Sequence, residues 1–105
     1  MEVKNCNSPA IKDCQCGSWL NHWTRISGSM VRMCIVKGCN NFDMVGSHIQ
    51  KVDSEDQDIY IIPLCKKHSE SDEVLEIFND IPLVSANVKT TCLNNASITL
   101  EQGER

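Results

Sequence analysis

Two pairs of potential metal ligands constrain this chain more than any other feature of its sequence. Cys34-x4-Cys39 places two thiols on either side of a glycine-containing turn, and Cys65-x2-His68 adds a third thiol and an imidazole. Structural zinc sites take four tetrahedral nitrogen and sulfur ligands, and three cysteines with one histidine are a recognised set. We therefore expect these four residues to bind one structural Zn²⁺ ion.

A metal site would also explain how so short a chain holds a fold. The 105 residues correspond to one domain, and only 5% of them are aromatic, so a purely apolar core would be thin. Seven cysteines are typical either of secreted disulfide proteins or of metal-binding proteins in reducing compartments. The sequence contains neither a leader-like N-terminus nor the ~18 apolar residues of a membrane span. We expect a cytoplasmic protein whose thiols bind metal, without a membrane segment.

In the first third of the chain, the sequence predicts one helix, over residues 17–27. Ser18 is placed to cap its start and Gly28 to end it. Its apolar face would consist of Trp19, Trp23 and Ile26, which recur at helical spacing. The polar residues 1–13 before the helix are expected to be loosely ordered. The two tryptophans are expected to pack the helix onto the zinc-binding core.

The rest of the chain predicts a hairpin followed by a second helix. The apolar residues 44–52 and 59–64 are expected to be its strands, joined by a polar loop over residues 53–58 with four carboxylates. Residues 69–79 carry acidic residues in the first turn and predict a helix. Its apolar stripe would consist of Val74, Leu75, Ile77 and Phe78. The remaining expectations are a strand or knuckle arm over 30–36, a tight turn over 37–39, a strand over 83–91 and a frayed tail over 94–105.

Together these elements predict a single α+β domain over residues 1–105. Its zinc-binding core would occupy residues 32–80, where a knuckle, a hairpin and a helix bring the two ligand pairs together. The N-terminal helix and the C-terminal strand would be additions to that core.

This order of knuckle, hairpin and helix resembles the treble-clef zinc finger, and more specifically the ββα-metal core of HNH nucleases. The resemblance covers residues 32–80 and rests on two segments. They are Gly46-Ser47-His48-Ile49 on the first strand and Ile61-Ile62-Pro63-Leu64-Cys65-x2-His68 entering the helix.

The resemblance implies a nuclease role for His48, because in that family the histidine of the first strand is the general base that activates water. The family also has an asparagine just before the Pro-Leu-Cys segment and a further histidine that helps to bind the catalytic metal. The asparagine position falls near Tyr60 and the last histidine position falls at Ser69, so neither matches. His48 could otherwise be a relic of such a site, a core histidine, or a zinc ligand in place of Cys39.

Most of the chain is also similar to small bacterial and phage proteins. The shared blocks are Cys14-Gln-Cys16-Gly-Ser-Trp19-Leu-Asn-His22-Trp23, Gly46-Ser47-His48-Ile49, Tyr60-Ile-Ile-Pro-Leu-Cys65-x2-His68 and Val84-Ser-Ala-Asn-Val-Lys-Thr-Thr-Cys92. This similarity implies a bacterial or phage origin but no activity.

The remaining cysteines leave three interpretations open. Cys14, Cys16 and His22 lie close together in sequence, and Cys92 could fold back to complete a second zinc site with them. Cys16 could instead be a reactive thiol ahead of a helix, with His22 as its base. In the third interpretation His22 is a packed or capping residue, and the cysteines, Cys6 included, are small buried residues or loop thiols.

The net charge of the chain indicates which kind of partner to expect, a protein or a nucleic acid. A formal net charge of −4 disfavours non-specific binding to nucleic acid and suits a basic protein partner. The acidic loop 53–58 would be a solvated turn, or a contact for a basic surface that partly mimics phosphate. We expect a non-enzymatic zinc-binding interaction module, which in a phage or mobile element would bind a nucleic-acid enzyme or a defence component. The alternative is an HNH-type metal-dependent nuclease with His48 as general base.

Overall fold

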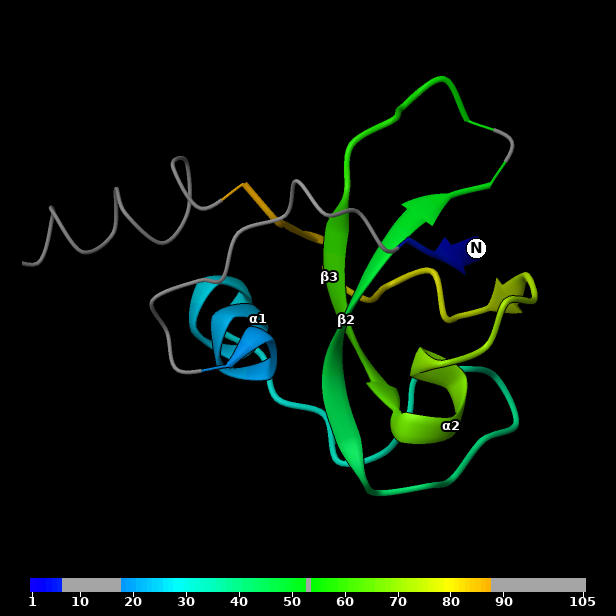
Figure 1. The fold of residues 1–105 in the computed structure, drawn as a ribbon. Helices are drawn as coiled ribbons and strands as arrows, with labels where there is room; N and C mark the ends of the chain where they lie inside the picture. The colour runs from blue at the N-terminus through cyan, green and yellow to red at the C-terminus, as the bar shows by residue number, and fades with distance from the viewer. Residues whose placement is uncertain (7–17, 53, 88–105) are drawn as a thin grey trace, which may run out of the picture.

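The computed structural model describes residues 1–6, 18–52 and 54–87, and within them it has two helices and five strands. They are β1 (Glu2–Asn5), α1 (Trp19–Ser27), β2 (Met44–Lys51), β3 (Tyr60–Cys65), α2 (Lys66–Ser69), β4 (Leu75–Glu76) and β5 (Val84–Ser85). The strands form one antiparallel sheet in the order β4-β1-β2-β3-β5 (Figure 1). The predicted α+β class is confirmed.

The β2–β3 hairpin forms the centre of the sheet, as the sequence predicts. Its register pairs Met44 with Cys65 and Ile49 with Tyr60. Pro63 lies opposite Gly46, near the end of β3.

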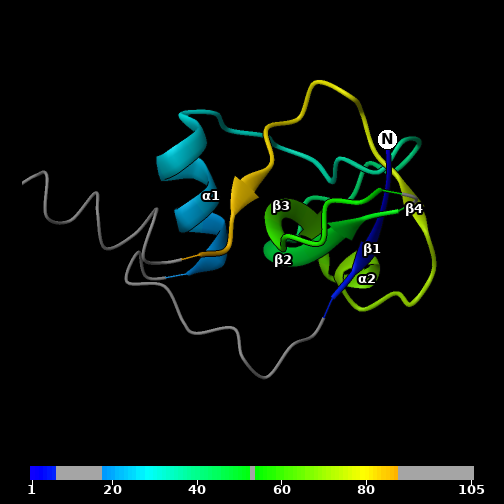
Figure 2. The same cartoon turned by 90° about the horizontal axis from the view of Figure 1, so that it is seen from above.

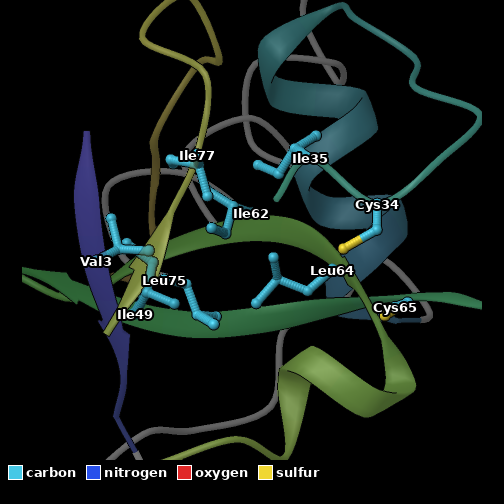
Figure 3. Packing of buried hydrophobic residues seen from close by; sticks show 9 residues of the cluster. All are labelled: Val3, Cys34, Ile35, Ile49, Ile62, Leu64, Cys65, Leu75 and Ile77. Carbon is cyan, nitrogen blue, oxygen red and sulfur yellow. The ribbon is translucent and has the colours of Figure 1, made fainter. Parts of the chain in front are cut away.

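The two faces of the hairpin carry different layers. Figures 1 and 2 show α1 and α2 on opposite sides of β2 and β3, while β1 and β4 continue the sheet beyond β2. On the side of α1, Trp23, Ile61 and Val84 form a small core cluster. The larger cluster is shown in Figure 3 and consists of Val3, Cys34, Ile35, Ile49, Ile62, Leu64, Cys65, Leu75 and Ile77. The molecule therefore has two cores that share one sheet.

The N-terminal helix confirms its prediction at both ends. The Ser18 side chain accepts a hydrogen bond from the Asn21 N–H at 3.1 Å, and Gly28 ends the helix with φ of 69°. Trp23 is fully buried, and its indole N–H donates to the Pro82 carbonyl at 2.8 Å. The tryptophan face thus seats α1 on the sheet.

Residues 2–5 form β1, a strand between β2 and β4, where the sequence suggested loosely ordered residues. Val3 is fully buried in the larger cluster, and its neighbours Glu2 and Lys4 are exposed. One apolar residue in a four-residue strand is too weak a pattern to recognise. The partners of β1 come from distant parts of the chain.

The helix predicted over residues 69–79 is wrong. The helical turn α2 ends at Ser69, and Leu75–Glu76 forms β4 against β1. Leu75 and Ile77 are buried whereas Val74, Glu76 and Phe78 are exposed, which is the two-residue alternation of a strand. The same apolar residues fit a helical stripe, and pairing with β1 decides between the two.

The remaining segments differ from their predictions mainly in how many residues are regular. Within residues 30–36 only Val36 forms a bridge, with Ile77, so this segment is a knuckle arm and not a strand. β5 contains Val84 and Ser85 of the predicted 83–91 strand, and residues 88–105, including the predicted tail, lie outside the described part. None of the helices in the described residues is long and apolar enough to cross a membrane.

Candidate metal centre

The four residues predicted as ligands come together at one end of the β2–β3 hairpin. One ligand atom from each of Cys34, Cys39, Cys65 and His68 lies within 4.8 Å of all the others. The Nδ1 atom of His68 is 3.5 Å from the sulfur of Cys34 and 3.3 Å from that of Cys65, and the sulfurs of Cys39 and Cys65 are 4.0 Å apart. This arrangement could hold a single metal ion.

The first ligand pair is shaped by a closed turn. The Cys39 N–H donates to the Val36 carbonyl at 3.0 Å, and the Cys34 N–H donates to the Asn41 carbonyl at 3.0 Å. Gly38 has φ of 85°, a conformation that residues with a side chain rarely adopt and that this tight turn requires. The turn over residues 37–39 is thereby confirmed, and it presents both sulfurs to the same side.

The second pair is positioned by the junction of β3 and α2. Cys65 is the N-cap of α2, and His68 lies one turn later. The Asn5 side chain donates to the carbonyls of His68 at 2.8 Å and Ser71 at 2.9 Å, which ties this turn to β1. Nothing in the sequence near Asn5 indicates this role, because its partners are more than sixty residues away.

A second residue missed by sequence reasoning is Asn41. Its side-chain amide donates to the Cys65 sulfur at 3.5 Å, so it supports a thiolate of the second pair from the loop of the first. Such outer hydrogen bonds orient ligands and tune the charge on them. In the sequence, an asparagine after a C-x4-C pair suggests only a turn.

The surroundings of Cys34 and Cys65 shift the pKa values of their thiols in opposite directions. Burial raises the pKa of Cys34 to about 11. Burial also acts to raise the pKa of Cys65, but hydrogen bonds from Asn41 and the backbone of His68 outweigh it and hold the pKa at about 6. These surroundings therefore favour ionisation of Cys65 before that of Cys34.

Metal affinity should consequently rise with pH. A metal must displace the protons of the ligand thiols, because a thiol with the ordinary pKa of about 8.5, or with a pKa raised by burial as at Cys34, is protonated at neutral pH. For each proton displaced, the dissociation constant should fall about tenfold per pH unit. Competition titrations with a chromogenic chelator between pH 6.5 and 8.5 would measure this slope. A flat profile would contradict a site in which Cys34 binds as a thiolate.

The residues of the predicted second zinc site are only partly placed. Cys14, Cys16 and Cys92 lie outside the described residues, so this site and the reactive-thiol interpretation stay predictions. His22 is fully buried, its Nε2 atom is 3.0 Å from the Ser85 carbonyl oxygen, and its ring meets Trp19 edge-on at 5.0 Å. Burial lowers the pKa of His22, while the Ser85 carbonyl raises it. This geometry fits the packed-histidine interpretation.

His48 lies on the face of the sheet that α1 covers. Its ring contacts Trp19 edge-on, with centroids 4.6 Å apart, and its backbone carbonyl accepts from the Cys6 N–H at 2.8 Å. The next residue, Ile49, packs into the larger cluster on the opposite face. His48 is absent from the ligand group, so it does not replace Cys39 as a ligand.

The predicted acidic loop is an ordered turn in its described part. Asp56 accepts from the Tyr60 hydroxyl and lies 3.1 Å from the Lys51 ammonium. The contact with Asp56 raises the pKa of Tyr60 to about 12. Of the carboxylates described in the loop, Glu55 and Asp58 are exposed and Asp56 is partly neutralised. Asp53 lies outside the described residues.

No family model, no curated protein and no solved structure matches this chain.

Proposed function

We propose that this chain is a zinc-stabilised interaction module without enzymatic activity, built on a treble-clef or ββα-metal arrangement. The observation that carries the proposal is the convergence of Cys34, Cys39, Cys65 and His68 on one point. These four ligands would fill a tetrahedral zinc site completely, and closed sites of this kind are structural.

The distances between the ligand atoms support zinc. Zn–S bonds of about 2.3 Å and Zn–N bonds of about 2.0 Å at tetrahedral angles place two sulfurs ~3.8 Å apart and a sulfur and a nitrogen ~3.5 Å apart. In the structure the separations are 4.0 Å for Cys39 and Cys65, and 3.3 Å and 3.5 Å from the sulfurs of Cys65 and Cys34 to the His68 nitrogen, and all four ligand atoms lie within 4.8 Å of one another. Small adjustments of side chains would therefore suffice.

The place of the ligands in the fold supports a structural role. Figure 3 shows Cys34 and Cys65 at one end of the larger core cluster, so a bound ion would extend that core. The ion would link the knuckle arm, the end of β3 and α2. Of these, α2 is a single helical turn that buries none of its residues. An element this short and exposed needs another source of stability, which the metal would supply.

The geometry around His48 weighs against the nuclease alternative. A catalytic metal would need His48 together with a ligand at or near the position of Ser69. His48 faces α1, whereas Ser69 ends α2, and Figures 1 and 2 place these helices on opposite sides of the hairpin. The asparagine position of the family falls near Tyr60, whose hydroxyl donates to Asp56. The residues of a nuclease site are thus replaced or separated.

We expect the zinc-loaded protein to leave DNA intact. Supercoiled plasmid incubated with Mg²⁺ or Mn²⁺ should show no nicking above the level of a His48→Ala variant, because residues 1–6, 18–52 and 54–87 contain no second group of metal ligands that includes His48. Agarose gels over several hours would measure the nicked and linear fractions. Cleavage by the unmodified chain that disappears in the variant would overturn the non-enzymatic proposal.

The zinc part of the proposal is tested by the metal content of the purified chain. Mass spectrometry under native conditions should find one zinc per chain. A folded protein that contains no metal would contradict the proposal. Two zinc ions per chain would retain it and add the second site predicted from Cys14, Cys16, His22 and Cys92.

A further inference from the structure

A depression of about 340 Å³ lies beside the metal ligands, between the C-x4-C turn and α2. This volume is at the lower end of the ~300–1,000 Å³ of small-ligand pockets. Its lining consists of Val36, Lys37, Gly38, Cys39, Asn40, Asn41, Lys67 and His68. The two half-buried metal ligands, Cys39 and His68, line it, while Cys34 and Cys65 are buried behind them. The metal centre thus has one covered side and one open side.

The lining is positively charged, although the chain as a whole is negative. Lys37 and Lys67 contribute two ammonium groups, and the described lining contains no carboxylate. Three thiolates and one Zn²⁺ carry a net charge of −1, so the two lysines more than offset the metal centre. At physiological salt, charges beyond ~8 Å are largely screened, so this local excess decides what binds here.

Both lysines are available to a ligand. The Lys37 ammonium lies 3.6 Å from a Glu76 carboxylate oxygen, and both side chains are about half exposed, so this pair is weak. Lys67 is exposed and makes no ion pair within residues 1–6, 18–52 and 54–87. Asn40 is exposed in the same lining and offers an amide donor.

An exposed aromatic residue lies next to this lining. Phe42, one residue beyond Asn41, has 77% of its surface exposed. Met33 is 45% exposed and precedes Cys34, whose N–H is bonded to the Asn41 carbonyl, so Met33 and Phe42 flank the same bond. Large apolar side chains exposed beside a polar depression are typical of protein contact surfaces.

We propose that this depression, with its apolar border, binds an acidic peptide segment of a protein partner. A carboxylate would lie between Lys37 and Lys67, and an adjacent apolar side chain would contact Phe42. A peptide fits better than nucleic acid, because the two lysines of the lining suffice for a peptide carboxylate, whereas affinity for nucleic acid depends on neutralising many phosphates. The inference rests on the interaction role proposed above and names its surface and partner class.

The experiment uses the full zinc-loaded chain at 0.15 M NaCl and two capped heptapeptides. The acidic probe is Gly-Glu-Glu-Phe-Glu-Glu-Gly, and its control carries glutamine at every glutamate. We expect the acidic probe to shift the backbone amide resonances of Lys37, Gly38, Cys39 and Lys67 in a saturable titration. The glutamine peptide should bind at least about tenfold more weakly, because it keeps the shape and loses the charge.

Matched variants test the two lysines. Exchanging both Lys37 and Lys67 for glutamine should weaken binding about two- to thirty-fold, since exposed ion pairs contribute ~0.2–1 kcal/mol each. Lys4→Gln removes one positive charge, as each single exchange does, from a residue of β1 outside the depression and should leave binding unchanged. Amide spectra and zinc content of each variant show that the fold is retained.

Several results would overturn the inference. The acidic peptide could fail to bind, or could bind no more tightly than the glutamine peptide. Its amide resonance shifts could be confined to residues outside the depression. A dodecathymidine oligonucleotide could bind to the depression when the acidic peptide does not. If the acidic peptide does not bind to a chain that still holds one zinc, only the proposed peptide-binding surface is refuted. A folded chain without zinc would refute the proposed function itself.

Discussion

Removal of zinc is expected to unfold the chain. Metal binding contributes ~10–16 kcal/mol to the folding of zinc-finger peptides at pH 7, whereas an entire small domain is stable by only ~5–15 kcal/mol. The free energy of metal binding is therefore as large as the free energy of unfolding of the whole domain. Added EDTA or a stronger chelator should abolish the dispersion of the amide spectrum and the fixed near-ultraviolet signal of Trp19 and Trp23.

The variant Cys65→Ser should reproduce this effect without a chelator. Cys65 is fully buried, lies next to His68 and Cys39, and belongs to both the metal centre and the larger core cluster. Cys6→Ser is the matched control, because Cys6 is a partly buried thiol outside the ligand group. It should keep one zinc per chain and the fold. Equal stability of the Cys65→Ser protein and its Cys6→Ser control would contradict a structural metal.

The metal centre could be predicted from the sequence because its chemistry is local. Each pair lies within six residues, so the spacing and the glycine between Cys34 and Cys39 already indicate a turn that presents two ligands. The hairpin could be predicted as well, because two short apolar segments are joined by a polar loop. Hairpin pairing between neighbouring segments then brings the two ligand pairs to one end.

The parts that could not be predicted depend on contacts between distant residues. Leu75 and Ile77 fit the stripe of a helix as well as the inner face of a strand, and only the presence of β1 beside them selects the strand. β1 has one buried residue, Val3, and its strand partners lie more than forty residues away. Asn5 and Asn41 support the ligands through hydrogen bonds whose partners no local pattern reveals.

The close packing of α1 on the sheet depends on a glycine for a different reason. A Cβ atom at position 46 would lie 2.3 Å from the Trp19 carbonyl carbon and 2.4 Å from the Leu20 nitrogen. Both are backbone atoms, so a change of rotamer cannot relieve the overlap. The first turn of α1 would have to move away from β2, and this movement would loosen the buried Trp23 and its hydrogen bond to Pro82.

Gly46→Ala is accordingly expected to destabilise the zinc-loaded protein by ~2–4 kcal/mol, the range of a severe overpacking change. For a domain of this size that corresponds to a fall in Tm of ~10–25 °C. Scanning calorimetry with excess zinc would measure it. The metal content should stay at one per chain, because the ligands lie at the end of the hairpin and α1 supplies none of them.

Gly28→Ala separates this packing effect from the cost of losing a glycine. Gly28 has φ of 69° but no atom within 4 Å of the position that a Cβ would take, so its substitution strains only the backbone. That strain costs ~1–2 kcal/mol. If Gly46→Ala proved no more destabilising than Gly28→Ala, α1 would not be seated on β2 at this contact. A larger loss at Gly46, with zinc retained, would show that the packing of α1 on β2 stabilises the fold in addition to the metal.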